Sequence, residues 1–227
     1  EISTRRFRAL ADRVGPDRVL WRYDPIVLGR MDGLALDADY HRRRFEELAR
    51  ALRGYTQRCY ISFINLYRKA RRNLSQAGLE PGAAGVQAPA ELTGLQAEAR
   101  RRLAADLAAI GAAHGIALYA CCDDALVGAG GVQKARCVDP EMIARLRPDL
   151  MISLKARPTR DRCGCVESVD IGAYDTCLFG CAYCYATRSR AVALARYQAH
   201  RPDATLLWPP AAPQRGRAAA GKATRRR

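Results

Sequence analysis

The run Cys59-Tyr60-Ile61-Ser62-Phe63-Ile64 is nearly continuous in apolar side chains and contains β-branched and aromatic residues. Such a short apolar run is typical of a buried β-strand. Two further runs, at residues 19–23 and 116–121, have the same character. Continuous apolar runs indicate parallel strands that are covered on both faces. The three runs therefore predict the centre of a parallel sheet.

Helices are expected between these strands. Residues 39–53 have apolar side chains on one face, and Asp39 is placed to cap the N-terminus of this helix. Residues 93–113 have a longer helical pattern that begins with Thr93 and, three residues later, Gln96, the spacing of a capping box. Shorter helices are expected at residues 3–14, 66–76, 140–147 and 187–199, and a loop at residues 78–91.

The order of the elements is β-α-β-α-β, because a helix-containing segment separates each strand from the next. This order predicts an α/β fold, either an open sheet or a partial or permuted (β/α) barrel. No glycine-rich phosphate loop follows any of the strands, which argues against a nucleotide-binding Rossmann domain. We expect a β/α-repeat partial barrel at residues 1–150, a cysteine-rich cluster-binding segment with a helix at 151–200, and a disordered basic tail at 201–227.

Polar side chains follow the predicted strands. Asp24 comes after the first strand, Ser62 and Asn65 close the second, and Cys121-Cys122-Asp123 closes the third. The carboxyl ends of the strands form the active site of α/β barrels, so we expect Asp24 and Ser62 to contact a cofactor there. The competing interpretation is turn chemistry, since Asp before Pro commonly begins a turn.

The C-terminal part contains Cys177-Leu178-Phe179-Gly180-Cys181-Ala182-Tyr183-Cys184, in which the cysteines have the spacing C-x3-C-x2-C. Three thiolates on one tight loop can hold three irons of a [4Fe-4S] cluster and leave the fourth iron open for chemistry. Gly180 lets the loop turn tightly, and Tyr183 is expected beside the cluster and any adenine bound to it. Zinc is the alternative, but a structural zinc site needs a fourth ligand, which Cys163 or Cys165 would supply.

Other cysteines suggest a second site. Cys163-Gly164-Cys165 is a C-x-C pair whose glycine lets both sulfurs turn the same way. With Cys137 and either Cys121 or Cys122 it makes four ligands, so we expect a second, fully ligated iron–sulfur cluster that relays electrons or anchors substrate. The alternative is that these are buried apolar thiols, which are common. Cys59 lies inside a strand and is expected to be part of the core.

The chain has 227 residues, of which nine are cysteines. A disulfide scaffold is the weaker interpretation, because such scaffolds are usually short and secreted and nine is an odd number. Thiols in loops after apolar strands suit metal ligation in a reducing cytoplasm. No apolar run approaches the roughly 20 residues of a membrane span, so we expect a cytoplasmic protein with no membrane contact.

The net charge is +15, and residues 209–227 carry six basic residues and no acidic one. A basic chain permits contact with nucleic acid. However, no aromatic side chains alternate with the basic residues of this tail, as a surface that stacks bases requires. A solvated tail is therefore the favoured interpretation.

The run from Cys163 to Cys177, continuing through Cys184-Tyr185-Ala186, resembles the DUF1848 family, a bacterial and archaeal family of unknown function. The likeness covers about residues 18–190 and includes three upstream segments: Arg22-Tyr23-Asp24-Pro25, Ile61-Ser62-Phe63 and Cys137-Val138-Asp139. The family commonly has His at the position of Phe179. Its members begin with further β/α units, so we expect this chain to be a fragment or a shortened form.

The cysteine cluster of that family is like the one in radical S-adenosylmethionine (SAM) enzymes, where it usually comes early in the chain. The resemblance implies a radical SAM-like fold with the loop moved to the end. It implies that a reduced [4Fe-4S] cluster on Cys177, Cys181 and Cys184 cleaves SAM to a 5′-deoxyadenosyl radical, with an electron donor such as flavodoxin or ferredoxin. The substrate stays unknown. The alternatives are a non-catalytic iron–sulfur protein that carries electrons or senses redox state, and a zinc-stabilised nucleic-acid-binding module.

Overall fold

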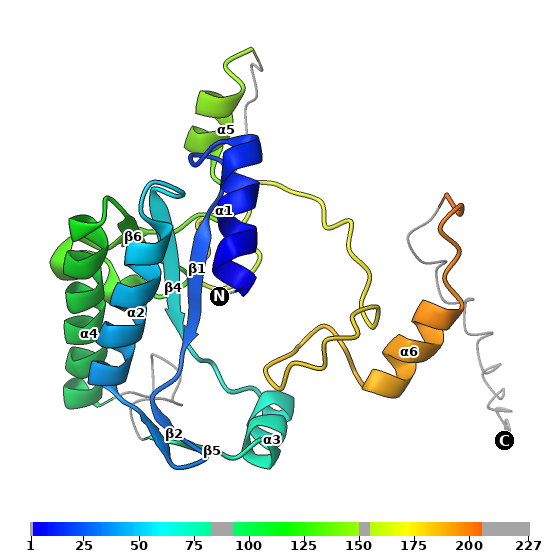
Figure 1. Cartoon of the computed structure of the whole chain (residues 1–227), viewed down its shortest axis with the longest axis horizontal. Coiled ribbons are helices and arrows are strands. Elements are labelled where there is room, and N and C mark those ends of the chain that lie inside the picture. Colours follow the sequence, from blue (N-terminus) through cyan, green and yellow to red (C-terminus); the bar gives the residue numbers. More distant parts are fainter. Residues whose placement is uncertain (1, 83–92, 150–154, 206–227) are drawn as a thin grey trace, which may run out of the picture. The chain divides into compact units, whose positions relative to one another are not determined.

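The structure is a computed structural model that describes residues 2–82, 93–149 and 155–205. The chain divides into two compact units, Glu1–Val169 and Asp170–Arg227, and each is described by itself (Figure 1). From residue 206 onward, the predicted basic tail lies outside the described residues.

The first unit contains an open four-stranded parallel sheet with the order β1-β4-β6-β7. The strands are β1 (Trp21–Ile26), β4 (Arg58–Phe63), β6 (Ala117–Ala120) and β7 (Gln133–Lys134). The first three correspond to the apolar runs, so the parallel sheet and the α/β class are confirmed. The described part of the chain contains no closed barrel.

Helices α2 (Ala38–Leu52) and α4 (Gly94–Ala113) lie side by side against one face of this sheet (Figure 1). Phe45 of α2 and Leu107 of α4 are fully buried in one core cluster with Ile61 of β4. Helix α1 (Ile2–Val14) reaches the same cluster through Phe7. Sequential strand order with α2 and α4 on one face is the arrangement found in segments of (β/α) barrels.

The opposite face of the sheet is more open than expected. In β1, Trp21 is buried whereas Arg22 and Asp24 are exposed, and the side chains of β6 also alternate in burial. The expectation that the strands are covered on both faces is therefore wrong for β1 and β6. A smaller apolar cluster of Tyr60, Cys121 and Ala135 covers part of this open face.

A second, antiparallel sheet was not expected from the sequence. It has the order β3-β2-β5 and consists of β2 (Gly29–Met31), β3 (Leu34–Leu36) and β5 (Leu79–Pro81). Asp32 and Gly33 join β2 to β3 with φ values of 48° and 81°, which suits a two-residue hairpin turn. Strand β5 falls inside the predicted loop at 78–91; residues 83–92 of that loop lie outside the described residues.

The remaining helices agree with the predicted pattern, and of the two predicted caps, on α4 and α2, the structure confirms the first. They are α3 (Arg68–Gln76), α5 (Pro140–Leu146) and, in the second unit, α6 (Arg190–Gln198). Thr93 and Gln96 form the predicted capping box of α4. The cap predicted at Asp39 is wrong, because α2 begins earlier and Asp37 accepts the hydrogen bond from the Tyr40 backbone N–H at 2.8 Å.

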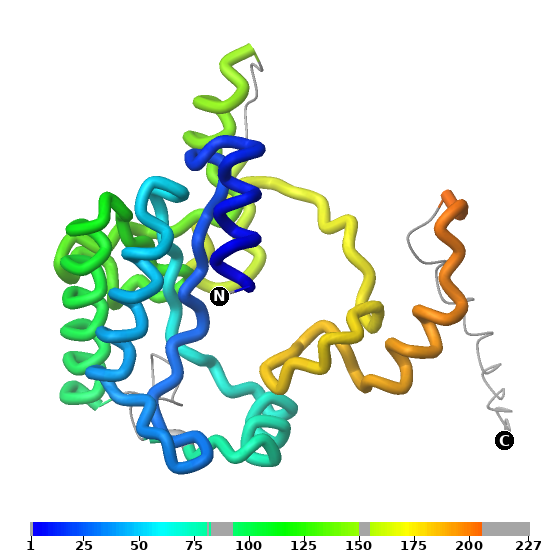
Figure 2. The backbone as a smooth tube through the Cα atoms, viewed as in Figure 1, coloured from blue at the N-terminus to red at the C-terminus, as the bar shows by residue number. Residues whose placement is uncertain are grey.

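After α5 the chain returns to the sheet, as the tube in Figure 2 shows. Ala156 forms an antiparallel bridge with Val166, and the Val166 backbone N–H donates to the Val138 carbonyl oxygen at 3.3 Å. Residues 155–166 are thereby held beside the segment that follows β7. Within the described parts of the chain, no helix has the length and apolar character needed to cross a membrane.

Candidate functional site

Asp24 of β1 and Ser62 of β4 meet at the carboxyl end of the sheet. The Ser62 hydroxyl donates to Asp24 Oδ1, and Arg22 forms an ion pair with Asp24 at 2.7 Å. Arg22 lies opposite Tyr60 in the parallel register, so these side chains belong to the open face. The sequence placed Asp24 and Ser62 at neighbouring strand ends, and the structure brings the two side chains into contact.

Three thiols lie at the same end of the sheet, and we call Cys121, Cys122 and Cys137 the edge thiols. Cys121 and Cys122 follow β6, and Cys137 follows β7. The Sγ atom of Cys121 lies 3.8 Å from that of Cys137 and 4.0 Å from that of Cys122. Cys121 is buried and Cys137 is exposed, and all three are free thiols.

Two arginines contact the edge thiols. Arg160 donates from Nε to Cys122 Sγ at 2.9 Å and from Nη2 to Cys121 Sγ at 3.5 Å. Arg22 donates from Nη1 to Cys137 Sγ at 3.3 Å. Guanidinium groups in this position favour thiolate over thiol. The edge thiols therefore lie in a positively charged environment.

The edge thiols have divergent acidities. The hydrogen bond from Cys137 lowers the pKa of Cys121, with Arg22 and Arg160 acting in the same direction against the effect of burial. As the donor to Cys121, Cys137 has a raised pKa. Burial raises the pKa of Cys122 to about 11, although Arg160 opposes this. Cys121 is thus the edge thiol that is most readily a thiolate.

The C-x-C pair is fixed beside the residues that follow β7. Cys165 Sγ accepts the Val138 backbone N–H at 3.4 Å, and Cys163 Sγ accepts the Cys165 backbone N–H at 3.5 Å. Burial opposes ionisation of Cys163, but hydrogen bonds from Cys165 and Thr159 outweigh it and lower the pKa of Cys163 to about 6. A Cβ on Gly164 would lie 3.3 Å from the Ala135 carbonyl oxygen, so glycine permits this close approach.

The C-x3-C-x2-C loop lies in the second unit, and its two ends are tied together by Asp175 and Arg188. The Asp175 backbone N–H donates to the Ala186 carbonyl oxygen at 2.8 Å. The buried Asp175 carboxylate accepts the Arg188 backbone N–H and, at 2.8 Å, Arg188 Nε. Those bonds hold the pKa of Asp175 below its usual range. The loop therefore begins and ends at a fixed base.

Inside the loop, Cys177 and Cys181 are exposed and Cys184 is half-buried. Gly180 has a φ of 69°, in the left-handed region that glycine adopts most easily. Arg190 of α6 donates to the Leu178 carbonyl oxygen at 2.9 Å. Tyr183 is half-buried.

The chemistry of the loop's donor set fits an iron–sulfur cluster. Cys177, Cys181 and Cys184 form no disulfide, and thiolates are the usual ligands of such clusters. As the side chains stand, the described residues contain no group of three or more His, Cys, Asp or Glu that could hold a metal ion. The ligand assignments therefore stay predictions that rest on spacing and donor type.

Sequence reasoning missed four charged residues that organise these groups. Arg22 had a usable signal, because it lies two residues before Asp24 and so on the same face of a strand. No such signal marks Arg160, Asp175 or Arg188. Arg160 contacts a cysteine 38 residues away, and Asp175 and Arg188 pair across an irregular loop.

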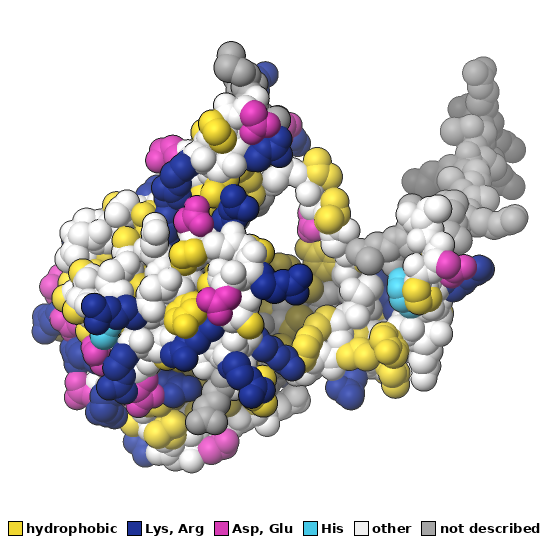
Figure 3. All heavy atoms as spheres, turned by 45° about the horizontal axis from the view of Figure 1, so that its top comes forward, with side chains coloured by type: hydrophobic (Ala, Val, Ile, Leu, Met, Phe, Trp, Pro, Cys, Tyr) yellow, Lys and Arg dark blue, Asp and Glu magenta, His cyan; other side chains and the backbone are white. Residues whose placement is uncertain are grey.

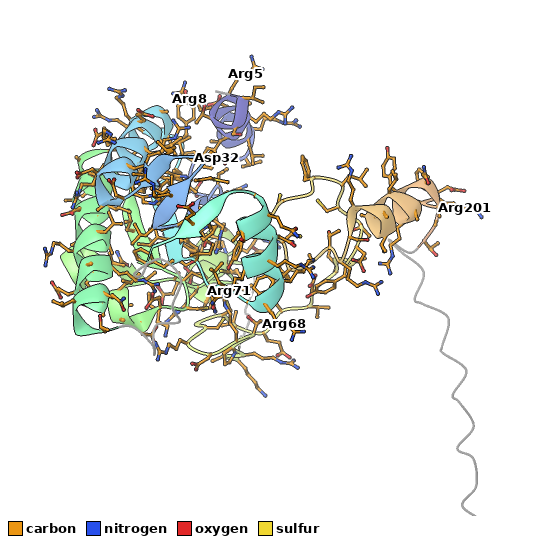
Figure 4. All side chains as sticks on the ribbon, turned by 90° about the horizontal axis from the view of Figure 1, so that it is seen from below. Arg5, Arg8, Asp32, Arg68, Arg71 and Arg201 are labelled. Atoms are coloured by element: carbon orange, nitrogen blue, oxygen red, sulfur yellow. The ribbon has the colours of Figure 1, made fainter. Side chains whose placement is uncertain are left out.

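Basic side chains of the first unit occur on several elements, including α1 and α3. On the face in Figure 3, Lys and Arg are interspersed with Asp and Glu. Figure 4 shows the exposed Arg5 and Arg8 on α1, away from the exposed Arg68 and Arg71 on α3. In the described residues, this distribution gives no support to a nucleic-acid-binding surface.

Comparison with curated proteins gave no match, and neither did comparison with solved structures. A family match, by contrast, covers residues 1–186, which include all nine cysteines and the sheet, and its family is described as a domain of unknown function, DUF1848. The chain therefore belongs to the DUF1848 family.

Proposed function

We propose that this is an iron–sulfur protein whose C-terminal loop holds a [4Fe-4S] cluster through Cys177, Cys181 and Cys184, and that it is a radical SAM-like enzyme. The observation that carries the proposal is the placement of three cysteines, none of them in a disulfide, on one short loop whose ends are tied by Asp175 and Arg188. Three protein thiolates leave one iron without a protein ligand. That is the arrangement needed to bind SAM.

The chain's own residues would prepare the site. Asp175 and Arg188 fix the base of the loop, and Arg190 holds the Leu178 carbonyl oxygen. These contacts already order the loop, so less conformational entropy is lost when its thiols bind iron. When bound, the cluster would supply single electrons for the reductive cleavage of SAM. The substrate is unassigned.

The test is anaerobic reconstitution of the full chain, followed by iron and sulfide analysis and electron paramagnetic resonance of the dithionite-reduced protein. We expect about four irons per cluster, a spectrum that changes when SAM is added, and formation of 5′-deoxyadenosine. Cys181→Ala should lose the cluster iron, the spectral response to SAM and the formation of 5′-deoxyadenosine. Cys59→Ala is the matched control, because Cys59 is a fully buried core thiol.

Two results would count against the proposal. A reduced cluster whose spectrum ignores SAM would indicate a non-catalytic iron–sulfur protein. Iron binding that survives Cys181→Ala would remove the loop as the ligand set. Asp175→Ala should lower iron retention, whereas Asp170→Ala should not, because Asp170 is exposed and accepts the backbone N–H of its near neighbour Gly172.

A further inference from the structure

We propose that Cys121, Cys137, Cys163 and Cys165 form a second metal site in the first unit, which holds one zinc-like ion through four thiolates. This site uses none of the cysteines of the C-terminal loop. It also differs from the second iron–sulfur cluster expected from the sequence, because the geometry points to a single ion.

The separation of the edge thiols is the first argument. In a tetrahedral site with zinc–sulfur bonds of about 2.3 Å, neighbouring sulfurs lie about 3.8 Å apart. The Cys121 and Cys137 sulfurs are 3.8 Å apart. In a [4Fe-4S] cluster each thiolate binds a different iron, so the sulfurs are spread around the cluster and lie farther apart. The observed pair fits one ion.

The position of the C-x-C pair is the second argument. Cys165 Sγ accepts a hydrogen bond from Val138, the residue that follows Cys137. The backbone of Cys165 in turn donates to Cys163 Sγ. Backbone N–H groups directed at sulfur stabilise thiolates without blocking a metal. The structure thus holds the Cys165 sulfur against the residue that follows Cys137, and the Cys163 sulfur against the backbone of Cys165.

Charge is the third argument. Four thiolates and one divalent ion carry a net charge of −2, which is costly in a partly buried site. Arg22 and Arg160 supply two positive charges, at 3.3 Å from Cys137 and 3.5 Å from Cys121 respectively. Arg22 also pairs with Asp24 at 2.7 Å, so its charge is shared between that carboxylate and Cys137, whereas Arg160 donates to two sulfurs.

Closing the site requires local side-chain movement, since the described residues do not yet surround one point with three ligands. Arg160 contacts both Cys121 and Cys122, so its guanidinium must move to the outside of the thiolates. Cys122 stays with Arg160 and is not a ligand. That assignment makes Cys122 an internal control next to a proposed ligand.

The experiment uses the full chain purified anaerobically, with zinc and iron measured per chain and with cobalt(II) alone as an optical probe. We expect about one zinc per chain and a thiolate-to-cobalt absorption band. Loss of a residue that merely supports a metal ligand costs about 10- to 100-fold in metal affinity. Cys137→Ser removes a ligand, so it should weaken zinc at least about tenfold while the iron content stays unchanged.

Matched variants separate this site from the C-terminal loop. Cys122→Ser should keep zinc and the cobalt band, and Cys181→Ala should keep zinc while losing iron. Cys137 is exposed, so its replacement should leave the near-ultraviolet circular dichroism unchanged, and Cys165→Ser provides a second test. Zinc binding unaffected by Cys137→Ser and Cys165→Ser would overturn the proposal. So would iron and sulfide at these cysteines in place of zinc, or a Cys121–Cys137 disulfide in the anaerobic protein.

Discussion

His41 is a buried histidine whose two ring nitrogens both have hydrogen-bond partners. Nδ1 lies 2.8 Å from the Tyr23 hydroxyl, and Nε2 lies 2.8 Å from the Val27 carbonyl oxygen. In the neutral ring, Nε2–H donates to Val27 and Nδ1 accepts from Tyr23, a tautomer assigned from the two partners. Burial lowers the pKa of His41 below its ordinary value of 6.5, so the folded protein keeps this ring neutral.

Acidification should therefore destabilise the first unit through His41. Below pH 6.5, His41 binds a proton more readily in the unfolded chain than in the folded one, so the free energy of unfolding falls as the pH falls. His41→Gln should cost about 1 kcal/mol at neutral pH through a lost hydrogen bond. It should also flatten the decline in stability between pH 6.5 and 5. Urea unfolding followed by circular dichroism measures both effects.

His200→Gln is the control for that experiment. His200 is exposed and lies in the second unit, so its replacement should leave the free energy of unfolding of the first unit unchanged. If the free energy of unfolding of His41→Gln falls with acidification as steeply as that of the wild type, the buried ring is not the group responsible.

The residues of the site differ in how far the sequence could predict them. Asp24, Ser62 and Cys121 were predictable because the carboxyl ends of parallel strands meet at one edge. The contact of Arg160 with Cys121 and Cys122 was not, because it joins positions 39 and 38 residues apart through irregular backbone. Strand periodicity says where a side chain points, but it does not say which distant loop returns to meet it.

At the scale of single elements, the residue at which α2 begins decides which of two aspartates caps the helix. Both Asp37 and Asp39 precede or begin the helix, but only Asp37 accepts the backbone N–H of Tyr40. Asp39 instead pairs with Arg42 on the surface, where its side chain is 71% exposed. Capping depends on the exact residue at which the helix begins, and a pattern read from the sequence fixes that point only to within a few residues.

Asp37→Ala should therefore lower the free energy of unfolding by about 1 kcal/mol, because it removes the side-chain acceptor of the first turn. Asp39→Ala should lower it by no more than about 0.5 kcal/mol, since exposed ion pairs contribute little. Asp37→Ser should restore most of the loss, as serine is also a good cap. Chemical unfolding of the three variants in parallel gives the comparison. Equal losses for the two alanine variants would contradict the assigned cap.

Short strands explain why part of the sheet was not predicted. β7 consists of Gln133 and Lys134, both exposed, and it is recognisable only because it pairs with Tyr119 and Ala120 of β6. The β2–β3 hairpin did carry a signal, the Asp32-Gly33 dipeptide, whose positive φ values match its turn. Elements of two or three residues depend on their neighbours more than on their own composition.

At the scale of the whole molecule, the sequence predicted which helices and strands exist better than how they are layered. The order β-α-β-α-β was correct, but periodicity alone could not place α2 and α4 on the same face or leave the other face open to Arg22 and Asp24. Both features depend on the handedness of the connections and on which strands become neighbours. The division into two units likewise depends on contacts that no local pattern records.

The two units predict the effect of removing the second one. The main core cluster of the first unit draws on residues from Trp21 to Val132, and the proposed zinc ligands all precede Val169. A chain that ends at Val169 should therefore unfold cooperatively, with a free energy of unfolding within about 1 kcal/mol of the full chain's, the range of changes made away from a core. It should keep zinc and lose iron, because Cys177, Cys181 and Cys184 are removed. Urea unfolding and metal analysis on the same preparations measure these quantities. Loss of the cooperative transition would mean that the second unit completes the fold of the first. Iron retained by the shortened chain would move the iron–sulfur site to the edge of the sheet.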